Sequence, residues 1–446
     1  YAPATEREYE ARLAFSMKFQ QYTAPVQAKG VEDTAFYRYN LLVALNEVGG
    51  EPSRFGRTAG EVHARNAARR QQAPHEMLTT ATHDTKLGED VRARIAVISE
   101  LPGEWRRHLS RWARINAGQH RKVRGRSAPD RNDEYRFYQV LLGAWPAPPP
   151  GGDPEPPSPR LVERLRDYMM KAIKEAKVHT SWVNDNEAYD AAMARFVENV
   201  LTGPSARRFL ASFLPFQARV ARLAVANSLA QVVLKIASPG APDFYQGTEL
   251  WDLHLVDPDN RQPVDFARRR ELLAQLAPLV PAIAGMAEQR AGGRDPAEGT
   301  PDRGEDRAAL LARMLDGWGD GRVKLWVTTA GLRARRARRE LFLNGEYQPL
   351  EAATNRGAEL FAFARLRGDE AAVAVVPRFV SRLGDGWRDW AANWGDAGVV
   401  LPDGLAGRRW VNALTGERLE AEAGDRGAFL PAATLLRHCP VALLIT

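Results

Sequence analysis

The amino-acid sequence predicts an α/β protein in which a mixed region of helices and short strands is followed by a small antiparallel β-sandwich domain. Residues 99–215 carry mainly helical apolar spacing and suggest a helical insertion, whereas short apolar runs on either side have the composition of buried strands. From residue 336 onward, short alternating runs stand between turn residues, which is typical of antiparallel β-structure. We therefore divide the chain into the segments 1–98, 99–215, 216–335 and 336–446.

The first helices are predicted from apolar residues that recur about every fourth position. Residues 6–23 form one predicted helix, which we expect to end in a loop at the Ala-Pro pair 24–25. A second helix is predicted over 36–45, ending at the Gly-Gly pair 49–50. The apolar and β-branched run 77–82 then predicts a buried strand whose tip presents polar side chains.

The central region contains the longest amphipathic pattern, over residues 161–182, after a Pro/Gly-rich loop at 146–159. A helix over 221–229 leads into the apolar run 232–236, which predicts a second buried strand ended by a Ser-Pro-Gly turn. The charged Pro/Gly stretch 295–306 predicts a surface loop.

The C-terminal part returns to a helical pattern over residues 307–339, interrupted at 317–321. The alternating runs at 360–364, 371–376 and 441–445 predict strands of the β-domain. This order of elements places the boundary of the β-domain close to residue 336.

Composition indicates a folded, soluble protein, with 44% hydrophobic and 26% charged residues. The single cysteine, Cys439, rules out an internal disulfide and a cysteine-based metal site, and a cytoplasmic location fits it. No cofactor or metal requirement is visible, and no run approaches the length of a membrane span. The net charge of +7 comes mostly from arginines spread along the chain, which argues against a nucleic-acid-binding face.

Three polar clusters are dense in catalytic residue types: residues 29–40, 82–86 and 245–252. Each starts or follows a predicted helix or strand, which is where a (β/α)8 barrel places its active-site loops. Their carboxylates, tyrosines and tryptophan suit a sugar, because hydroxyls need hydrogen-bond partners and pyranose faces stack on aromatic rings.

Five segments resemble those of maltooligosyl trehalose synthases, which belong to the α-amylase clan of glycoside hydrolases. The segments are Ala-Lys-Gly-Val-Glu-Asp-Thr-Ala-Phe-Tyr-Arg at 28–38, Thr-His-Asp-Thr-Lys at 82–86, Thr-Ser-Trp at 180–182, Ser-Pro-Gly-Ala-Pro-Asp-Phe-Tyr-Gln-Gly-Thr-Glu at 238–249 and Leu-Val-Asp-Pro-Asp-Asn-Arg-Gln-Pro-Val-Asp at 255–265. The resemblance implies that the mixed region is the C-terminal part of a (β/α)8 TIM barrel. Tyr1 in place of a start methionine agrees with a sequence that begins inside a longer chain.

The resemblance also implies an isomerase that works by intramolecular transglycosylation. It would convert the reducing-end α-1,4 bond of a maltooligosaccharide to an α,α-1,1 bond, in trehalose biosynthesis. A retaining site of this kind uses one carboxylate as nucleophile and another as general acid. Asp84 matches a third carboxylate that stabilises the transition state, and His83 matches a neighbour that contacts the same ring.

The remaining candidate residues would hold the glucose that turns within the closed site. They are Lys29, Glu32, Asp33, Tyr37 and Lys86, with Glu249 and Asp252 extending the wall. The family's nucleophile and general-acid strings, Gly-x-Arg-x-Asp and Asp-x-x-x-Asn-His, do not occur in the 446 residues. We therefore expect this fragment to be inactive alone, with a maltodextrin as substrate and a trehalohydrolase as pathway neighbour.

Plainer interpretations stay open for each candidate. Asp84 would also serve as a cap of the following helix, beside Glu89 or Asp90, and His83 as a core histidine. The two lysines would also suit the protein surface, and Glu32-Asp33 an ordinary helix N-terminus. Tyr37 and Trp251 would also be ordinary packing residues. The alternative functions are another hydrolase or transferase of the same clan and a non-catalytic carbohydrate-binding fragment.

Overall fold

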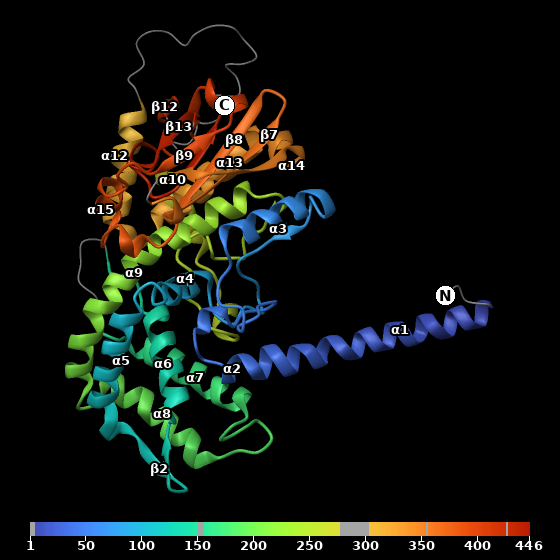
Figure 1. The fold of residues 1–446 in the computed structure, drawn as a ribbon. Helices are drawn as coiled ribbons and strands as arrows, with labels where there is room; N and C mark the ends of the chain where they lie inside the picture. Colours follow the sequence, from blue (N-terminus) through green and yellow to red (C-terminus); the bar gives the residue numbers. More distant parts are fainter. Residues whose placement is uncertain (1–4, 150–155, 277–302, 354–355, 425–426) are drawn as a thin grey trace. The chain divides into compact units, whose positions relative to one another are not determined.

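The computed structural model describes residues 5–149, 156–276, 303–353, 356–424 and 427–446 (Figure 1). The chain forms two compact units, each built from separate stretches of the sequence. The first unit contains residues 1–55, 108–141 and 157–211, and the second contains 56–107, 142–156 and 212–446. The four segments drawn from the sequence pattern stay a prediction.

The first unit begins with α1 (Glu6–Gln27), which extends away from the rest of this unit and buries none of its side chains (Figure 1). The chain then continues without a break as a π-helix, η1 (Ala28–Ala35). The predicted loop at 24–25 is therefore wrong. Pro25 removes one amide donor, but the next turn still forms, because the Ala28 amide donates to the Ala24 and Pro25 carbonyls.

The predicted helix over 36–45 is also wrong for most of its length. The structure has only α2 (Phe36–Arg38) and a 3-10 turn, η2 (Val43–Leu45). The side-chain amide of Asn46 donates to the carbonyls of Phe36 and Tyr39, both at 2.7 Å. A side chain that occupies these carbonyls competes with helix continuation.

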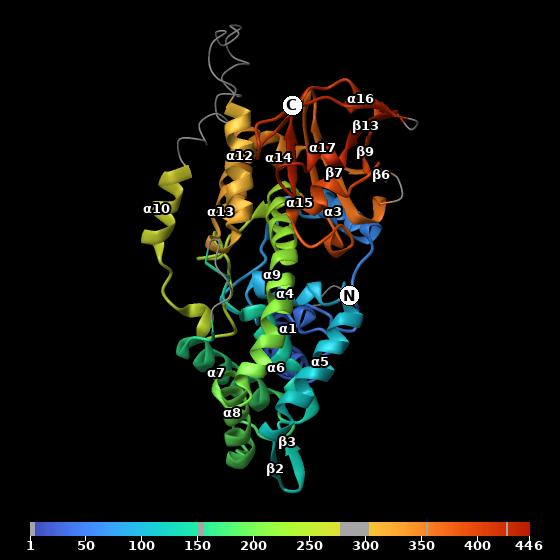
Figure 2. The same cartoon turned by 90° about the vertical axis from the view of Figure 1, so that its left-hand side faces the viewer.

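Helices and one hairpin complete the first unit. They are α5 (Pro102–Asn116), η3 (Ala117–Gln119), β2 (Arg121–Val123), β3 (Arg126–Ala128), α6 (Arg131–Ala144), α7 (Pro159–Ala176) and α8 (Glu187–Thr202), and α5 and α6 each cross a boundary between the units. The buried face predicted for α7 is confirmed, since Leu161, Leu165, Tyr168, Met169 and Ile173 are all buried. The predicted end at residue 182 is wrong, because the helix ends at Ala176 and Lys177 adopts the left-handed conformation. Helices α7 and α8 lie side by side (Figure 2).

The second unit starts with α3 (Ala59–Gln72), β1 (Met77–Leu78) and α4 (Glu89–Val97). After α9 (Ala206–Ala237), which enters from the first unit, come β4 (Ala241–Pro242), η4 (Asp259–Arg261) and α10 (Phe266–Leu276). Strands β1 and β4 pair in parallel, with Met77 opposite Ala241 and Leu78 opposite Pro242. This pair is the only parallel one in the described ranges, which contain no closed barrel.

Two strand predictions need correction. The strand expected over 77–82 spans only Met77 and Leu78, and Met77 is 68% exposed. The strand expected over 232–236 is the last part of α9, with Val232, Val233 and Ile236 almost fully buried. A short apolar run cannot by itself distinguish a buried strand from a helix buried on all sides.

Helix α9 is long and apolar enough to cross a membrane by length and composition alone. In the structure, however, 78% of its apolar window is buried inside the protein. Such burial is typical of a core helix, and core helices can have the same length and apolar composition as membrane-spanning ones.

Helices α12 (Arg303–Asp316), α13 (Arg322–Ala337) and α14 (Arg339–Asn344) follow, with a 3-10 turn η6 (Trp318–Asp320) between the first two. The predicted helical region and its interruption at 317–321 are confirmed. Of the surface loop expected at 295–306, residues 295–302 lie outside the described residues. Residues 303–306 belong to helix α12, so the loop prediction is wrong for them.

The C-terminal part forms two antiparallel sheets, which confirms the antiparallel prediction. The six-stranded sheet has the order β11-β10-β14-β8-β7-β5, and the four-stranded sheet has the order β12-β13-β9-β6. The strands are β5 (Glu346–Leu350), β6 (Ala352–Ala353), β7 (Leu360–Arg367), β8 (Glu370–Pro377), β9 (Gly398–Leu401), β10 (Trp410–Asn412), β11 (Arg418–Leu419), β12 (Glu422–Gly424), β13 (Gly427–Pro431) and β14 (Ala442–Ile445). Short helices lie between them: η7 (Gly357–Glu359), η8 (Val380–Arg382), α15 (Trp387–Ala392), α16 (Asp403–Ala406) and α17 (Ala432–Leu435).

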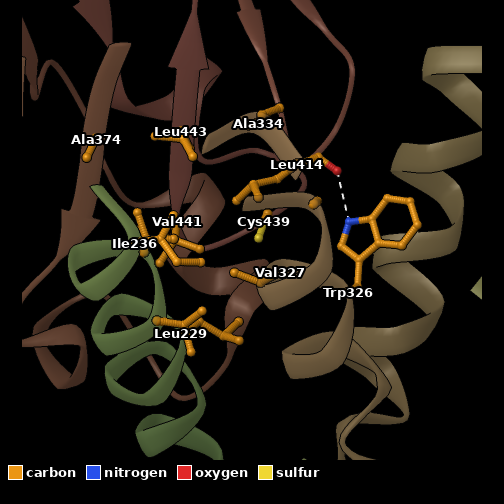
Figure 3. Close-up of a cluster of buried hydrophobic side chains, with 14 of the residues drawn as sticks. Leu229, Ile236, Trp326, Val327, Ala334, Ala374, Leu414, Cys439, Val441 and Leu443 are labelled. Atoms are coloured by element: carbon orange, nitrogen blue, oxygen red, sulfur yellow. Dashed lines mark hydrogen bonds between the residues drawn. The ribbon is translucent and has the colours of Figure 1, made fainter. Parts of the chain in front are cut away.

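A hydrophobic core joins the six-stranded sheet to α9 and α13 (Figure 3). Ile236 of α9, Val327 of α13 and Leu443 of β14 belong to it, all with no exposed surface. The indole of Trp326 donates to the carbonyl of Leu414 at 2.9 Å, so the buried ring keeps its hydrogen bond. Helices and sheet in the second unit therefore share one core.

Candidate active site

The parallel strands β1 and β4 bring the polar clusters 82–86 and 245–252 to the same end of the strand pair. The amide of Asp243 donates to the Leu78 carbonyl at 2.8 Å, so the two chains still run together where the strands end. Gly240, just before β4, has a φ of +120°, and a Cβ there would lie 2.7 Å from Leu78 Cγ. The close strand approach therefore requires glycine. Both loops that follow leave from the same carboxyl end of this parallel pair.

The His83-Asp84 pair sits in an exposed turn after β1. Thr82 and Thr85 close this turn, because the Thr82 amide donates to the Thr85 hydroxyl at 2.6 Å and the Asp84 amide to the Thr82 hydroxyl at 3.2 Å. Asn260 donates from its side-chain amide to the carbonyls of His83, at 2.9 Å, and Thr85, at 3.4 Å. The backbone of the turn is thus held in place while the Asp84 side chain faces solvent.

The segment after this turn pairs with the loop that follows β4. Leu87 and Leu255 form an antiparallel bridge, and the Gly88 amide donates to the His254 carbonyl at 2.8 Å. A Cβ on Gly88 would lie 2.6 Å from the Asp252 carbonyl oxygen, so only glycine allows this approach. The predicted site residue Lys86 is buried here, with 6% of its surface exposed.

A buried network of charges lies at the start of α4, directly after these loops. The ammonium of Lys324 from α13 lies 2.7 Å from Glu89 Oε1, 2.6 Å from Asp90 Oδ2 and 3.1 Å from the Leu250 carbonyl. Lys235 from α9 donates to the Thr80 hydroxyl at 2.9 Å, and Thr80 also bonds Glu89. The network therefore connects two helices to the loops after β1 and β4.

Burial and charge set the pKa values of this network. Burial by itself would lower the pKa of Lys324, but Asp90 and Glu89 raise it well above its usual value. Burial would likewise raise the pKa of Glu89, but Lys324 and Lys235 lower it overall. The pKa of Lys235 is lowered, first by burial and also by the nearby Lys324 charge. The pair of Glu89 and Lys324 is therefore ionised at neutral pH.

Asp252, a predicted substrate contact, belongs to this network. Its Oδ2 accepts a bond from the Glu89 amide at 3.1 Å, and its own amide donates to Asp90 Oδ2 at 2.6 Å. Its Oδ1 lies 2.8 Å from the His254 imidazole. Burial would raise the pKa of Asp252, but His254 and Lys324 lower it. This placement favours a structural role for Asp252. Its contact with substrate stays a prediction.

Glu249 lies on the loop after β4 and is partly exposed. Its Oε2 accepts from Arg269 Nε at 2.9 Å, and Nη2 of the same guanidinium donates to the Gly247 carbonyl at 2.5 Å. The arginine thus ties the Glu249 carboxylate to its own loop. In the second unit, the structure brings His83, Asp84, Lys86, Glu249 and Asp252 onto two adjoining loops.

The other predicted site residues belong to the first unit. Lys29, Glu32 and Asp33 are all in the π-helix η1, a rare conformation that is frequent at functional sites. The Lys29 ammonium lies 2.5 Å from Asp33, and Glu32 accepts a bond from the Gly49 amide at 3.1 Å. A pocket shared by these residues and the loops of the second unit stays a prediction.

Tyr37, on α2, is buried with 3% of its surface exposed. The guanidinium of Arg136 lies 5.0 Å from its ring centroid and donates to the Tyr168 hydroxyl at 2.8 Å. Among the described residues, no partner bonds the Tyr37 hydroxyl. Burial raises the pKa of Tyr37 well above its usual value, with Tyr168 adding to the effect. This burial suits a packing role for Tyr37, and its contact with substrate stays a prediction.

Sequence reasoning missed the residues beneath the loops. The sequence pattern places Glu89 and Asp90 only beside the start of a helix, and Asn260 only within a matching segment, without a role. Lys235 and Lys324 stand alone inside apolar runs, Val-Val-Leu-Lys-Ile and Val-Lys-Leu-Trp-Val. A single lysine inside a buried apolar run needs a carboxylate partner. This pattern is the signal in the sequence that could have identified Lys235 and Lys324.

One group in the described ranges has the composition of a metal site: Asp130, Asp133 and His179 in the first unit, with ligand atoms within 4.8 Å of one another. These side chains already bond each other and a neighbour. His179 lies 2.7 Å from Asp130, and the Tyr189 hydroxyl donates to Asp133 at 2.5 Å. The group is accounted for as a hydrogen-bond network.

Comparisons with known proteins give one consistent family name. No family profile matches the chain. A curated protein of Mycobacterium tuberculosis (strain CDC 1551 / Oshkosh), named "Putative maltooligosyl trehalose synthase", is 36% identical over 430 residues, which is 96% of this chain and 45% of that protein. The chain therefore spans about half the length of the curated relatives it matches.

Solved structures agree. That of maltooligosyltrehalose synthase from Arthrobacter ramosus is 34% identical with a TM-score of 0.71, covering 96% of this chain and 46% of that one. A hypothetical maltooligosyl trehalose synthase from Sulfolobus tokodaii is 28% identical with a TM-score of 0.67, covering 99% of this chain and 48% of that one.

Proposed function

Because this chain belongs, as a partial sequence, to the maltooligosyl trehalose synthase family, we propose that it supplies part of the active site of such an enzyme. The reaction is an intramolecular transglycosylation. It moves the reducing-end glucose of a maltooligosaccharide from an α-1,4 bond to an α,α-1,1 bond.

One observation carries the proposal: the exposed Asp84 stands on a fixed turn after β1, beside the loop that follows the parallel strand β4. We infer that β1 and β4 are two neighbouring strands of a (β/α)8 barrel of the α-amylase clan. Active-site loops of such barrels leave the carboxyl ends of the strands. Asp84 would then face the reacting sugar.

Asp84 would stabilise the transition state of a retaining mechanism. That state resembles an oxocarbenium ion, so a fixed carboxylate beside the distorted ring lowers its energy. His83 would contact the same ring. We assign the nucleophile and the general acid to neither of these residues, and their family motifs do not occur in the sequence.

The freed glucose must turn within the site without escaping, and water must be kept out, because hydrolysis competes for the same glycosyl-enzyme. Lys29, Glu32, Asp33, Tyr37 and Lys86 would hold it, with Glu249 and Asp252 extending the wall. Release of trehalose by a trehalohydrolase in the cytoplasm is part of the same proposal.

The test is to supply the full-length protein that carries this chain with maltoheptaose. Loss of reducing ends without release of glucose is the expected result, because the new bond joins two anomeric carbons. Rising reducing power would identify a hydrolase of the same clan instead. Binding of the sugar without any change in it would leave only the carbohydrate-binding alternative.

A further inference from the structure

A groove of about 570 Å³ lies wholly within the first unit. Its walls come from the π-helix η1, the end of α7 and the loop between α7 and α8. The lining residues are Lys29, Glu175, Lys177, Val178, His179, Thr180, Ser181, Trp182, Val183 and Asn184. Of these, only Lys29 has a part in the function proposed above.

The loop that carries Trp182 is held closed by its own hydrogen bonds. The Ser181 amide donates to the Asn184 carbonyl at 3.1 Å, and the Asn184 amide donates back to the Ser181 hydroxyl at 2.9 Å. Thr180 is buried and accepts a bond from the Asn186 amide at 3.1 Å. The loop therefore presents a fixed surface.

Trp182 is both exposed and oriented, with 57% of its surface open to solvent. Its indole Nε1 donates to Glu175 Oε1 at 3.0 Å, and the Lys174 ammonium lies 5.1 Å from the ring centroid. An aromatic ring that is ordered before a ligand arrives binds it with less loss of conformational entropy. Such a ring offers a flat apolar face to a partner that is flat and apolar on one side.

The groove is anchored to the segment that holds the predicted site residues. The Lys177 ammonium donates to the Thr34 hydroxyl at 2.8 Å, and that hydroxyl donates to the Lys29 carbonyl at 2.7 Å. Thr34 thus connects the residue after α7 to the π-helix, and its hydroxyl also bonds the Lys29 backbone. The groove is continuous with Lys29.

We propose that this groove binds glucose units of an α-1,4-linked glucan, with the Trp182 indole stacked on one ring. The ammonium groups of Lys29 and Lys177 and the carboxylate of Glu175 supply donors and an acceptor, which is the mixture that sugar hydroxyls need. Val183, the next residue in the loop, is 90% exposed and adds apolar surface to the groove. The proposal rests on the proposed function, because that function makes a maltodextrin the substrate.

The experiment measures binding of maltoheptaose by titration calorimetry to the full-length protein and three variants. Trp182→Ala should raise the Kd for maltoheptaose roughly three- to tenfold. Trp182→Phe keeps an aromatic ring, so its loss of affinity should be less than half of that loss. Trp387→Ala is the matched control. This second-unit tryptophan also lines a groove and donates from its indole to a carboxylate, that of Asp316, at 3.1 Å.

Each outcome decides the proposal. Unchanged binding by Trp182→Ala, with a circular dichroism spectrum like that of the parent, overturns it, and so does an equal loss in Trp387→Ala. If the parent protein forms the α,α-1,1 product but Trp182→Ala binds as the parent does, only the groove assignment fails. If the parent protein neither binds nor converts maltoheptaose, the proposed function fails with it.

Discussion

The ammonium of Lys324 lies 2.7 Å from the carboxylate of Glu89, 235 residues away in the sequence, and both side chains are almost completely buried. The pair connects α13 to the start of α4, directly after the turn that carries Asp84. A buried ion pair contributes little net stability, but it fixes the position of the elements that it joins. The position of the candidate catalytic turn therefore depends on a helix far along the chain.

Replacing Lys324 with methionine should destabilise the protein by about 3–5 kcal/mol, because Glu89 and Asp90 would be left buried without their main positive partner. Urea unfolding monitored by tryptophan fluorescence measures the change. Lys122→Met, at an exposed lysine of the β2–β3 hairpin, serves as the control and should change stability by less than about 0.5 kcal/mol. Equal stability of the two variants would contradict the ion-pair assignment.

Asp84→Asn in the full-length protein should lower kcat for maltoheptaose about 100- to 1000-fold, since the neutral amide cannot stabilise developing positive charge. Thermal unfolding should stay unchanged, because the Asp84 side chain is exposed. Asp403→Asn, an exposed acid at the start of α16, is the control and should keep full activity. Normal turnover by Asp84→Asn would remove this residue from the mechanism.

Asn260 positions the same turn, because its amide donates to the carbonyls of His83 and Thr85. Asn260→Ala should lower kcat roughly tenfold or more with little change in KM, as expected when a reacting group is displaced. The free energy of unfolding should fall by about 1 kcal/mol.

The matched control for Asn260 is Gln262→Ala, two residues further on, whose amide donates to Asp259 instead of to the turn. A rise in KM with kcat unchanged would indicate that Asn260 acts in ground-state binding and not in positioning.

The pH dependence of stability should report on Asp133. Burial, together with the charge of Asp130, raises the pKa of this carboxyl to about 6 from 3.8. The folded protein therefore binds the Asp133 proton more tightly than the unfolded chain does. The contribution of this proton to the free energy of unfolding is complete below pH ~4 and is lost as the pH rises through about 6. Asp133→Asn, which resembles the protonated form and still accepts from Tyr189, should be more stable than the parent at pH 7 by about 2 kcal/mol.

Urea unfolding at pH 4 and pH 7 measures this difference, which should nearly vanish at the lower pH. The exposed acid Asp167 supplies the control, since Asp167→Asn should show no such dependence. A destabilised Asp133→Asn variant at pH 7 would mean that the ionised carboxylate is favourable where it lies.

Local sequence pattern was a good guide wherever an element buries one face. The apolar spacing in α7 predicted which side chains are buried, and the alternating runs predicted β7, β8 and β14. In these elements the period of the apolar residues and the geometry of the backbone agree. The same method failed for 232–236, because a short, mostly buried apolar run does not reveal the period of the helix to which it belongs.

The helix predicted over 36–45 failed for a different reason. Its apolar spacing is adequate, but Asn46 takes the carbonyls of Phe36 and Tyr39, and Gln139, far along the chain, accepts from the Val43 amide at 3.0 Å. No local pattern announces an acceptor that arrives from another helix. Side chains from outside the segment therefore decided its conformation.

The sequence by itself determined the chemical types present: the His83-Asp84 pair, the charged segment of η1, the aromatic residues and the alternating C-terminal strands. Only the tertiary structure decided that the loops after β1 and β4 adjoin, that Asn260 holds the turn, and that Lys235 and Lys324 lie beneath it. The physical reason is that hydrogen bonds and ion pairs act over a few ångströms, whereas their partners here are separated by more than a hundred residues along the chain.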